Sequence, residues 1–109
     1  MATVIPFEEI QLSPTAALFQ GGDDFDASIF VVHYERGISV PLHTHPYPEV
    51  FVVLDGTAKF TLGDEELIVE SGHMTMAPPE TPHGFEGVSD ETLRVVSVHP
   101  QGKVEQTWL

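Results

Sequence analysis

The sequence predicts an all-β protein, folded as one small barrel or sandwich domain over residues 1–109. Short runs rich in β-branched and aromatic residues recur along the chain, and turn residues separate them at intervals of roughly 8–12 residues. One run, Thr57 to Leu62, alternates cleanly and places Ala58 and Phe60 on the same face as Leu62. A chain of 109 residues has the length of one domain, and about 65% of its surface can be buried on folding.

Six runs are expected to form strands. In chain order they are Ser28 to Tyr34, Glu49 to Leu54, Thr57 to Leu62, Leu67 to Val69, Met74 to Ala77 and Leu93 to Val98. Asp55-Gly56 separates the second run from the third and is typical of a tight hairpin. Gly63-Asp64 ends the third run, and the acidic residues around it are expected at a solvated hairpin tip.

The segment before the first run is the one place where a helix can be considered. Ser13 could cap it, Pro14 could occupy its first turn and Gly21 could end it. Five or six residues make a marginal helix, however. We prefer a loop between strands at Gly21-Gly22-Asp23-Asp24, so the all-β prediction stands.

The composition excludes several classes of partner and site. Seventeen Asp and Glu against four Lys and Arg give a net charge of −13, which disfavours nucleic acids and anionic membranes. No apolar run exceeds five residues, so no membrane-spanning helix is expected, and Met1 to Ile10 does not resemble a signal peptide. The absence of cysteine excludes disulfide, iron–sulfur and Cys-based zinc sites and fits a reducing compartment, so a cytoplasmic location is expected.

Histidines and one glutamate carry the clearest chemical signal. In an extended segment His43 and His45 point to the same face, so both imidazoles can reach one cation. Glu49 shares their parity, and His83 could complete the set from an adjacent strand. Imidazole and carboxylate both ligate divalent transition metals. The other three histidines, at positions 33, 73 and 99, have no such companions and are expected at the surface, solvated, or as satisfied core residues.

Two motifs in the chain resemble those of the cupin superfamily. The first spans residues 37–56 and reads Gly37-ISVPL-His43-Thr44-His45-PYP-Glu49-VFVVLD-Gly56, without departure from the family pattern. The second spans residues 72–87 and reads Gly72-HMTMA-Pro78-Pro79-Glu80-TP-His83-GFE-Gly87. It keeps the family spacing, but Glu80 stands where the family usually has Gly, and Gly87 stands where it usually has Asn.

The resemblance implies a small single-domain cupin, or monocupin, with a jelly-roll-like double-stranded β-barrel. It also implies that His43, His45, Glu49 and His83 point into the barrel at one metal ion. Three neutral imidazoles and one carboxylate would leave a divalent ion with one net positive charge and, in an octahedral ion, two open positions. This donor set suits one Mn, Fe, Ni, Co or Zn ion per chain.

Two classes of function are compatible with such a site. One is a metal-dependent enzyme acting on a small organic molecule, most readily a dioxygenase-type oxidoreductase, with isomerase or decarboxylase chemistry as variants. The other is a non-catalytic cupin that binds or senses a small ligand or a metal. No acid or base beyond the ligands is evident. Tyr47, Glu80 and His73 are weak candidates, each expected to be structural or solvated.

The strand after Glu49 is apolar on both faces. If Glu49 faces the barrel interior, Phe51 and Val53 do too, and the outward residues Val50, Val52 and Leu54 need a cover. A second subunit is one possible cover and the segment Val4 to Phe7 is another. The resemblance favours the subunit, because small cupins commonly pair, so a homodimer is expected.

Met74 and Met76 alternate in the run that ends at Ala77, and both side chains are expected in the core.

Overall fold

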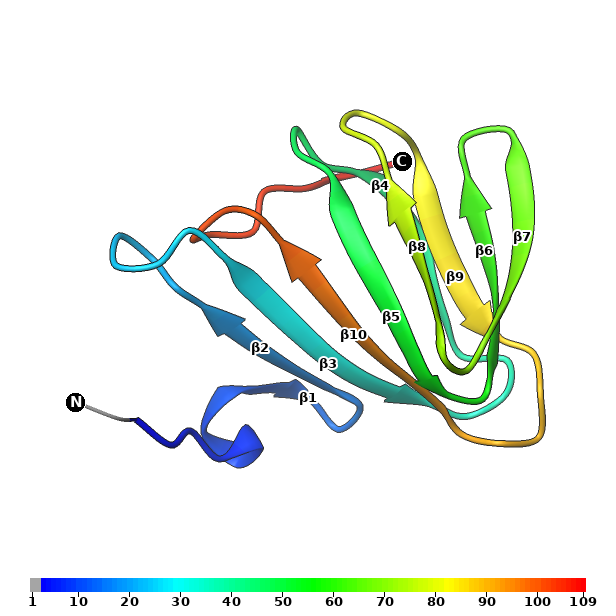
Figure 1. The fold of residues 1–109 in the computed structure, drawn as a ribbon, viewed down its shortest axis with the longest axis horizontal. Coiled ribbons are helices and arrows are strands. Elements are labelled where there is room, and N and C mark those ends of the chain that lie inside the picture. Colours follow the sequence, from blue (N-terminus) through cyan, green and yellow to red (C-terminus); the bar gives the residue numbers. More distant parts are fainter. Residues whose placement is uncertain (1–2) are drawn as a thin grey trace.

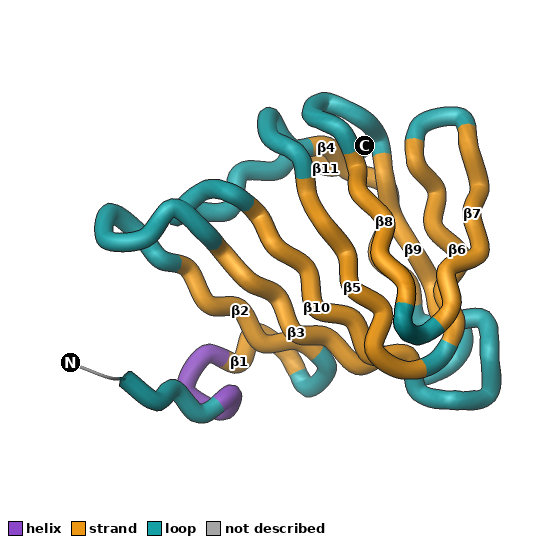
Figure 2. Tube along the Cα trace, viewed as in Figure 1, coloured by secondary structure: helices purple, strands orange, loops and turns teal. Residues whose placement is uncertain are grey.

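The computed structural model describes residues 3–109, and over this range the regular secondary structure consists of strands apart from one short 3-10 helix, with loops and turns between them (Figures 1 and 2). The elements are η1 (Phe7–Ile10), β1 (Gln11–Ser13), β2 (Ala16–Gln20), β3 (Ser28–Tyr34), β4 (Ser39–Thr44), β5 (Glu49–Asp55), β6 (Thr57–Leu62), β7 (Glu65–Glu70), β8 (His73–Ala77), β9 (His83–Gly87), β10 (Leu93–His99) and β11 (Thr107–Trp108). The all-β prediction is confirmed. None of the described helices is long and apolar enough to cross a membrane.

The strands form two antiparallel sheets that enclose the core (Figure 1). The six-stranded sheet has the order β1-β2-β3-β10-β5-β8, and the five-stranded sheet has the order β11-β4-β9-β6-β7. All six predicted runs are strands. The 13–20 region contains no helix, because its second half, β2, pairs with β3 and places Ala17 opposite Val31. Residues 21–27 then form the loop that we preferred.

Gly56 does not close a hairpin, and this prediction was wrong. β5 pairs with β10 and β8, whereas β6 pairs with β7 and β9, so the chain crosses from one sheet to the other at Gly56. The glycine is needed there for two reasons. Its φ is +78°, and a Cβ would lie only 2.9 Å from the Thr92 carbonyl oxygen. Gly63, with a φ of +61°, does help close the β6–β7 hairpin, as expected.

The core lies between the sheets and is rich in aromatic rings. Phe51 and Val53 of β5 are buried, as the alternation predicts, and Phe51 packs on Phe60 and Phe85 of the other sheet with ring centroids 4.9 and 5.6 Å apart. Burial of these side chains supplies the main driving force for holding the two sheets together. The core occupies one end of the space between the sheets and leaves the other end for polar residues.

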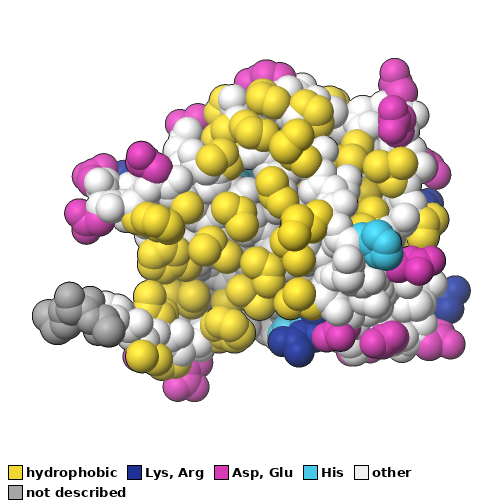
Figure 3. Space-filling view, in the orientation of Figure 1, with side chains coloured by type: hydrophobic (Ala, Val, Ile, Leu, Met, Phe, Trp, Pro, Cys, Tyr) yellow, Lys and Arg dark blue, Asp and Glu magenta, His cyan; other side chains and the backbone are white. Residues whose placement is uncertain are grey.

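The outer face of the six-stranded sheet is apolar and uncovered, and Figure 3 shows its hydrophobic side chains across the centre of the view. Met74 and Met76 of β8 are 70% and 54% exposed, so the prediction that they are core residues was wrong. β8 is an edge strand whose register sets Met76 beside Val50, so both methionines share the outward face. The segment 4–7 does not provide the cover either, because it is exposed and the helix that follows it contacts β2.

Candidate metal centre

The four residues of the predicted ligand set meet between the two sheets. His43 lies near the end of β4 and is paired directly opposite His83, the first residue of β9. His45 follows β4, and Glu49 begins β5 in the other sheet. All four side chains are buried, and one potential ligand atom from each lies within 4.8 Å of the others. Residues from separate strands therefore converge as the spacing predicts.

The backbone sets the orientation of all three imidazoles. The Nδ1 atoms of His43, His45 and His83 lie 2.7–2.8 Å from the carbonyl oxygens of Pro41, Glu105 and Thr81, respectively. A carbonyl oxygen can only accept, so each Nδ1 carries the hydrogen and donates it. In the neutral rings each Nε2 then keeps a free lone pair, which is the form that ligates a metal.

The donor atoms fit a cation. Glu49 Oε1 lies 2.9 Å from His45 Nε2 and 3.1 Å from His83 Nε2, so acceptor atoms face one another unless the rings take up protons. The buried Nε2 of His45 has no directed hydrogen bond within residues 3–109. A divalent ion bound by the four residues would satisfy these atoms together.

Burial and the same contacts shift the pKa values of three residues in the ligand cluster. Burial lowers the pKa of His43. Burial also acts to lower the pKa of His45, but the adjacent Glu49 carboxylate and the hydrogen bond to the Glu105 carbonyl outweigh it and raise that pKa. For Glu49, burial acts to raise the pKa, yet contacts with His45, His83 and His99 hold it well below its ordinary value. Glu49 is therefore an anion in the folded protein.

His99 is the functional residue that the sequence reasoning missed. It was expected to be solvated, but its side chain is 1% exposed, its Nε2 lies 2.9 Å from Glu49 Oε2, and its Nδ1 lies 2.8 Å from the Tyr47 hydroxyl. A signal was present, because His99 shares parity along β10 with the buried residues Leu93 and Val95. The alternation along β10 therefore indicates a buried position for residue 99, even though no histidine neighbours it in the chain.

The remaining candidate residues lie away from the ligand cluster, except Tyr47, which contacts it. His33 and His73 are exposed, as expected. Glu80 is exposed too, and its φ of +59° explains why the family pattern has Gly at this position. Tyr47 is buried with its ring stacked on that of His45 at a centroid distance of 5.1 Å.

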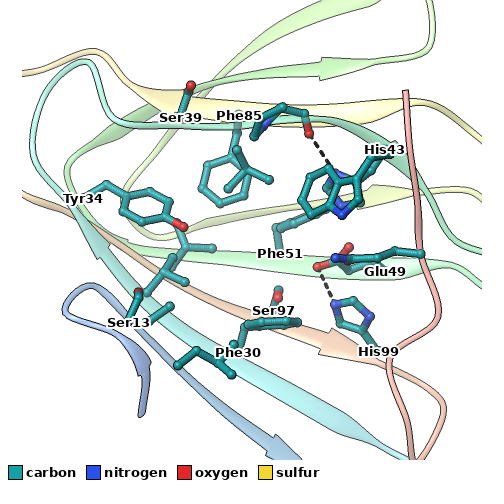
Figure 4. Close-up of a pocket in the computed structure, with 18 residues that line it drawn as sticks. Ser13, Phe30, Tyr34, Ser39, His43, Glu49, Phe51, Phe85, Ser97 and His99 are labelled. Atoms are coloured by element: carbon teal, nitrogen blue, oxygen red, sulfur yellow. Dashed lines mark hydrogen bonds and ion pairs between the residues drawn. The ribbon is translucent and has the colours of Figure 1, made fainter.

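A cavity of about 360 Å³ opens onto the cluster (Figure 4). His43, Glu49 and His99 lie at one end of it, and Tyr34, Ser13 and Ser39 lie at the other. Apolar and aromatic side chains form most of the wall, including Trp108 of β11, whose ring centroid is 4.9 Å from that of His43. None of the lining residues is Lys or Arg.

A family model for the cupin domain matches residues 30–99, which include both motifs, most of β3 and all of β4 to β10. This chain belongs to the cupin family. The predicted cupin fold is confirmed by that match and by the solved structures to which the chain is similar. It is similar to a cupin-like protein from Thermotoga maritima, with a TM-score of 0.74 at 21% identity over 86% of this chain and 75% of that one.

Two further solved structures share the fold. One is an uncharacterized protein with a double-stranded β-helix domain from Klebsiella pneumoniae, with a TM-score of 0.80 at 20% identity over 99% of this cupin and 97% of that chain. The other is a mutant of oxalate decarboxylase from Bacillus subtilis, with a TM-score of 0.82 at 18% identity over 94% of this cupin and 31% of that chain.

Curated relatives are similar in sequence. Quercetin 2,3-dioxygenase of Bacillus subtilis is 36% identical over 84 residues, which is 76% of this cupin and 24% of the relative. An uncharacterized protein of Methanocaldococcus jannaschii is 31% identical over 61 residues, 55% of this cupin and 49% of the relative. The cupin therefore spans about a quarter of the first relative and about half of the second.

Proposed function

We propose that this cupin binds one divalent transition-metal ion through His43, His45, Glu49 and His83 and acts as a dioxygenase-type oxidoreductase on a small organic molecule. The observation that carries the proposal is the opening of a buried, four-residue ligand cluster onto an apolar cavity. The similarity to a quercetin dioxygenase supports the reaction class. Mn, Fe, Ni, Co and Zn all suit the donor set.

The side chains of the chain prepare the site in three ways. The carbonyl partners of the three Nδ1 atoms direct Nε2 lone pairs toward the centre, and the Glu49 anion offsets part of the charge of a divalent ion. The aromatic wall binds an apolar substrate and excludes water. A bound ion would supply Lewis-acid or redox chemistry and open coordination positions for substrate and dioxygen.

The wall of the cavity also narrows the substrate class. A cavity of about 360 Å³ lies within the ordinary range for small-molecule sites, and rings such as Phe30, Phe85 and Trp108 favour a flat, largely apolar substrate. No lining Lys or Arg could pair with a second carboxylate of the substrate. A neutral aromatic or diketone compound with an oxygen that can reach the metal therefore fits better than a dicarboxylate such as oxalate.

The test begins with metal content and proceeds to oxygen uptake. Protein stripped with a chelator is reloaded with each candidate ion, and elemental analysis is expected to give close to one ion per chain. Oxygen consumption is then measured with catechols, flavonols, 1,3-diketones and oxalate. His83→Ala serves as the site variant, and His33→Ala on the exposed part of β3 is its matched control.

The outcomes separate the two classes of function. Oxygen uptake that requires His83 but not His33 supports the enzyme. Stoichiometric metal and saturable ligand binding without turnover would favour the non-catalytic binding or sensing cupin. Reloaded protein that holds no metal would refute the proposed metal site, whether the cupin is an enzyme or a binding protein.

We also propose that the cupin forms a homodimer through the outer face of the six-stranded sheet. Leu54, Met74 and Met76 expose a continuous apolar surface there beside the half-buried Val50 and Val52. The net charge of −13 opposes pairing, so association should strengthen as salt screens it. Light scattering is expected to give a dimer that Met74→Glu with Met76→Glu dissociates, whereas a monomer at every salt concentration would contradict pairing.

A further inference from the structure

His99 differs from the three motif histidines in what its Nδ1 faces. The motif histidines direct Nδ1 at backbone carbonyls, whereas His99 directs Nδ1 at the Tyr47 hydroxyl, 2.8 Å away. The contact is buried and joins residues 52 positions apart in the chain. A hydroxyl group can donate as well as accept, so this partner does not force the hydrogen onto Nδ1.

The surroundings of Tyr47 decide the direction of that hydrogen bond. The backbone N–H of Glu105 donates to the Tyr47 hydroxyl oxygen at 3.1 Å. The phenolic hydrogen then needs an acceptor, and within residues 3–109 the hydroxyl contacts none other than Nδ1 of His99. Tyr47 therefore donates its hydrogen to Nδ1 of the neutral His99 ring. The hydrogen of His99 then resides on Nε2, so this nitrogen has no lone pair to offer a metal. His99 is thus a donor beside the cluster, whereas the motif histidines are acceptors within it.

The polar atom that His99 Nε2 contacts is Glu49 Oε2, at 2.9 Å. Like His45 Nε2, this buried nitrogen makes no directed hydrogen bond within residues 3–109, so its contact with Oε2 is a close approach of the two atoms. The other carboxylate oxygen, Oε1, faces His45 and His83 inside the cluster. The two oxygens of Glu49 are therefore divided between the ligand cluster and His99, and Figure 4 shows the contact with His99.

We infer that Tyr47 and His99 form a positioning pair that holds Glu49 Oε2 and thereby presents Oε1 alone to the metal. The inference rests on the proposed metal site and adds to it two residues that occupy no ligand position in either motif. His99 Nε2–H lies 2.9 Å from Oε2 and attracts this anionic oxygen electrostatically, and the Tyr47 hydroxyl keeps the hydrogen on Nε2. Outer partners of this kind raise metal affinity because they fix the orientation of a ligand before the ion arrives.

The peptide of Glu105 ties this pair to the rest of the site. Its N–H donates to Tyr47, and its carbonyl oxygen accepts from Nδ1 of His45. The Tyr47 ring also stacks on the His45 ring, with planes 5° apart. The C-terminal segment thus orients one ligand directly and another through Tyr47 and His99, although it lies outside the residues that the family model matches.

Metal affinity and the coordination sphere of the full-length protein test the inference. Dissociation constants for Mn²⁺ and Co²⁺ are measured by chelator competition for wild type, His99→Phe, His99→Gln, Tyr47→Phe and the double variant of His99→Phe with Tyr47→Phe. His33→Phe, at an exposed site, is the control for the substitution itself. Melting temperatures of the metal-free proteins report folding separately from affinity.

Replacement of His99 by Phe is expected to weaken metal binding by about 10- to 100-fold. Gln, whose amide can also donate to Oε2, is expected to recover most of this loss. Tyr47→Phe keeps the stacked ring, so it should weaken binding to a smaller extent. Because the hydroxyl acts through His99, Tyr47→Phe should add almost nothing in the His99→Phe background. Should His99→Phe fail to fold, the comparison of His99→Gln with Tyr47→Phe and wild type still decides the matter.

The number of coordinated imidazoles separates positioning from direct ligation. Pulsed electron paramagnetic resonance of the metal-loaded protein should count three imidazoles in both wild type and His99→Gln. Loss of one imidazole in His99→Gln would make His99 a ligand and overturn the inference. Wild-type affinity in His99→Phe would overturn it as well. A wild-type protein that binds no metal would instead refute the proposed function, which is a separate result.

Discussion

The carboxylate of Glu49 is the only anionic group in the ligand cluster, and Glu49→Gln isolates the effect of its charge. Glutamine has almost the same shape and keeps one oxygen, so the perturbation removes charge with little change of volume. Glu65→Gln, at an exposed position of β7, makes the same chemical change away from the site and is the matched control.

The size of the effect follows from the geometry. All four ligand atoms lie within 4.8 Å of one another, so an ion among them is within about 4 Å of the carboxylate. At an effective dielectric constant of about 20, two unit charges 4 Å apart attract by about 4 kcal/mol, and a divalent ion doubles this to about 8 kcal/mol. Desolvation of the buried carboxylate offsets several kcal/mol. A net loss of about 4 kcal/mol corresponds to roughly a thousandfold weaker binding.

The assay is chelator competition with Mn²⁺ or Co²⁺ at about pH 8, where unperturbed imidazoles are neutral. Melting temperatures of the metal-free proteins, measured at the same pH, confirm that each variant folds. Glu65→Gln should bind like wild type. If folded Glu49→Gln bound the ion less than about tenfold more weakly, a loss below about 1.4 kcal/mol, the carboxylate would not be a ligand and the charge argument would be refuted.

Three further predictions concern protons, packing and the cavity. Metal affinity should fall as the pH drops from about 8 to about 5, because protons compete with the metal for the imidazoles, and the raised pKa of His45 makes this competition begin at a higher pH. A flat pH profile in competition titrations would exclude histidine ligands. Phe60→Ala should lower the free energy of unfolding by about 3–5 kcal/mol in urea titrations, because Phe60 is fully buried against Phe51 and Phe85. Ile68→Ala, at an exposed position, is the control and should change this free energy by less than about 0.5 kcal/mol. Trp108→Ala should weaken binding of an aromatic ligand by about two- to tenfold in fluorescence or calorimetric titrations and leave metal affinity unchanged. If the variant bound the ligand as tightly as wild type, Trp108 would not contribute to ligand binding.

Alternation along the chain is a local property, which is why the strands rich in branched and aromatic residues could be predicted. β4 and β9 escaped the composition-based prediction because they contain Pro41 and Gly84, residues that disfavour strands in isolation. Pairing between these strands, with His43 opposite His83, overrides that preference. Gly56 shows a related limit: a turn residue marks a change of direction, but pairing with distant strands decides which sheet the next strand joins.

The sequence by itself predicted the all-β fold class, and strand parity grouped His43, His45 and Glu49. The resemblance to the cupin motifs added His83 and implied that all four residues bind one metal ion. Only the tertiary structure decided the surroundings of His99. Its burial depends on Tyr47 and on Phe30, whose ring centroid lies 5.2 Å from its own. Neither residue is near position 99 in the chain. The direction of its hydrogen bond with Tyr47 depends on the Glu105 peptide. Such contacts exist only after the sheets have packed together, so the alternation along β10 could indicate that His99 is buried but not which groups it contacts.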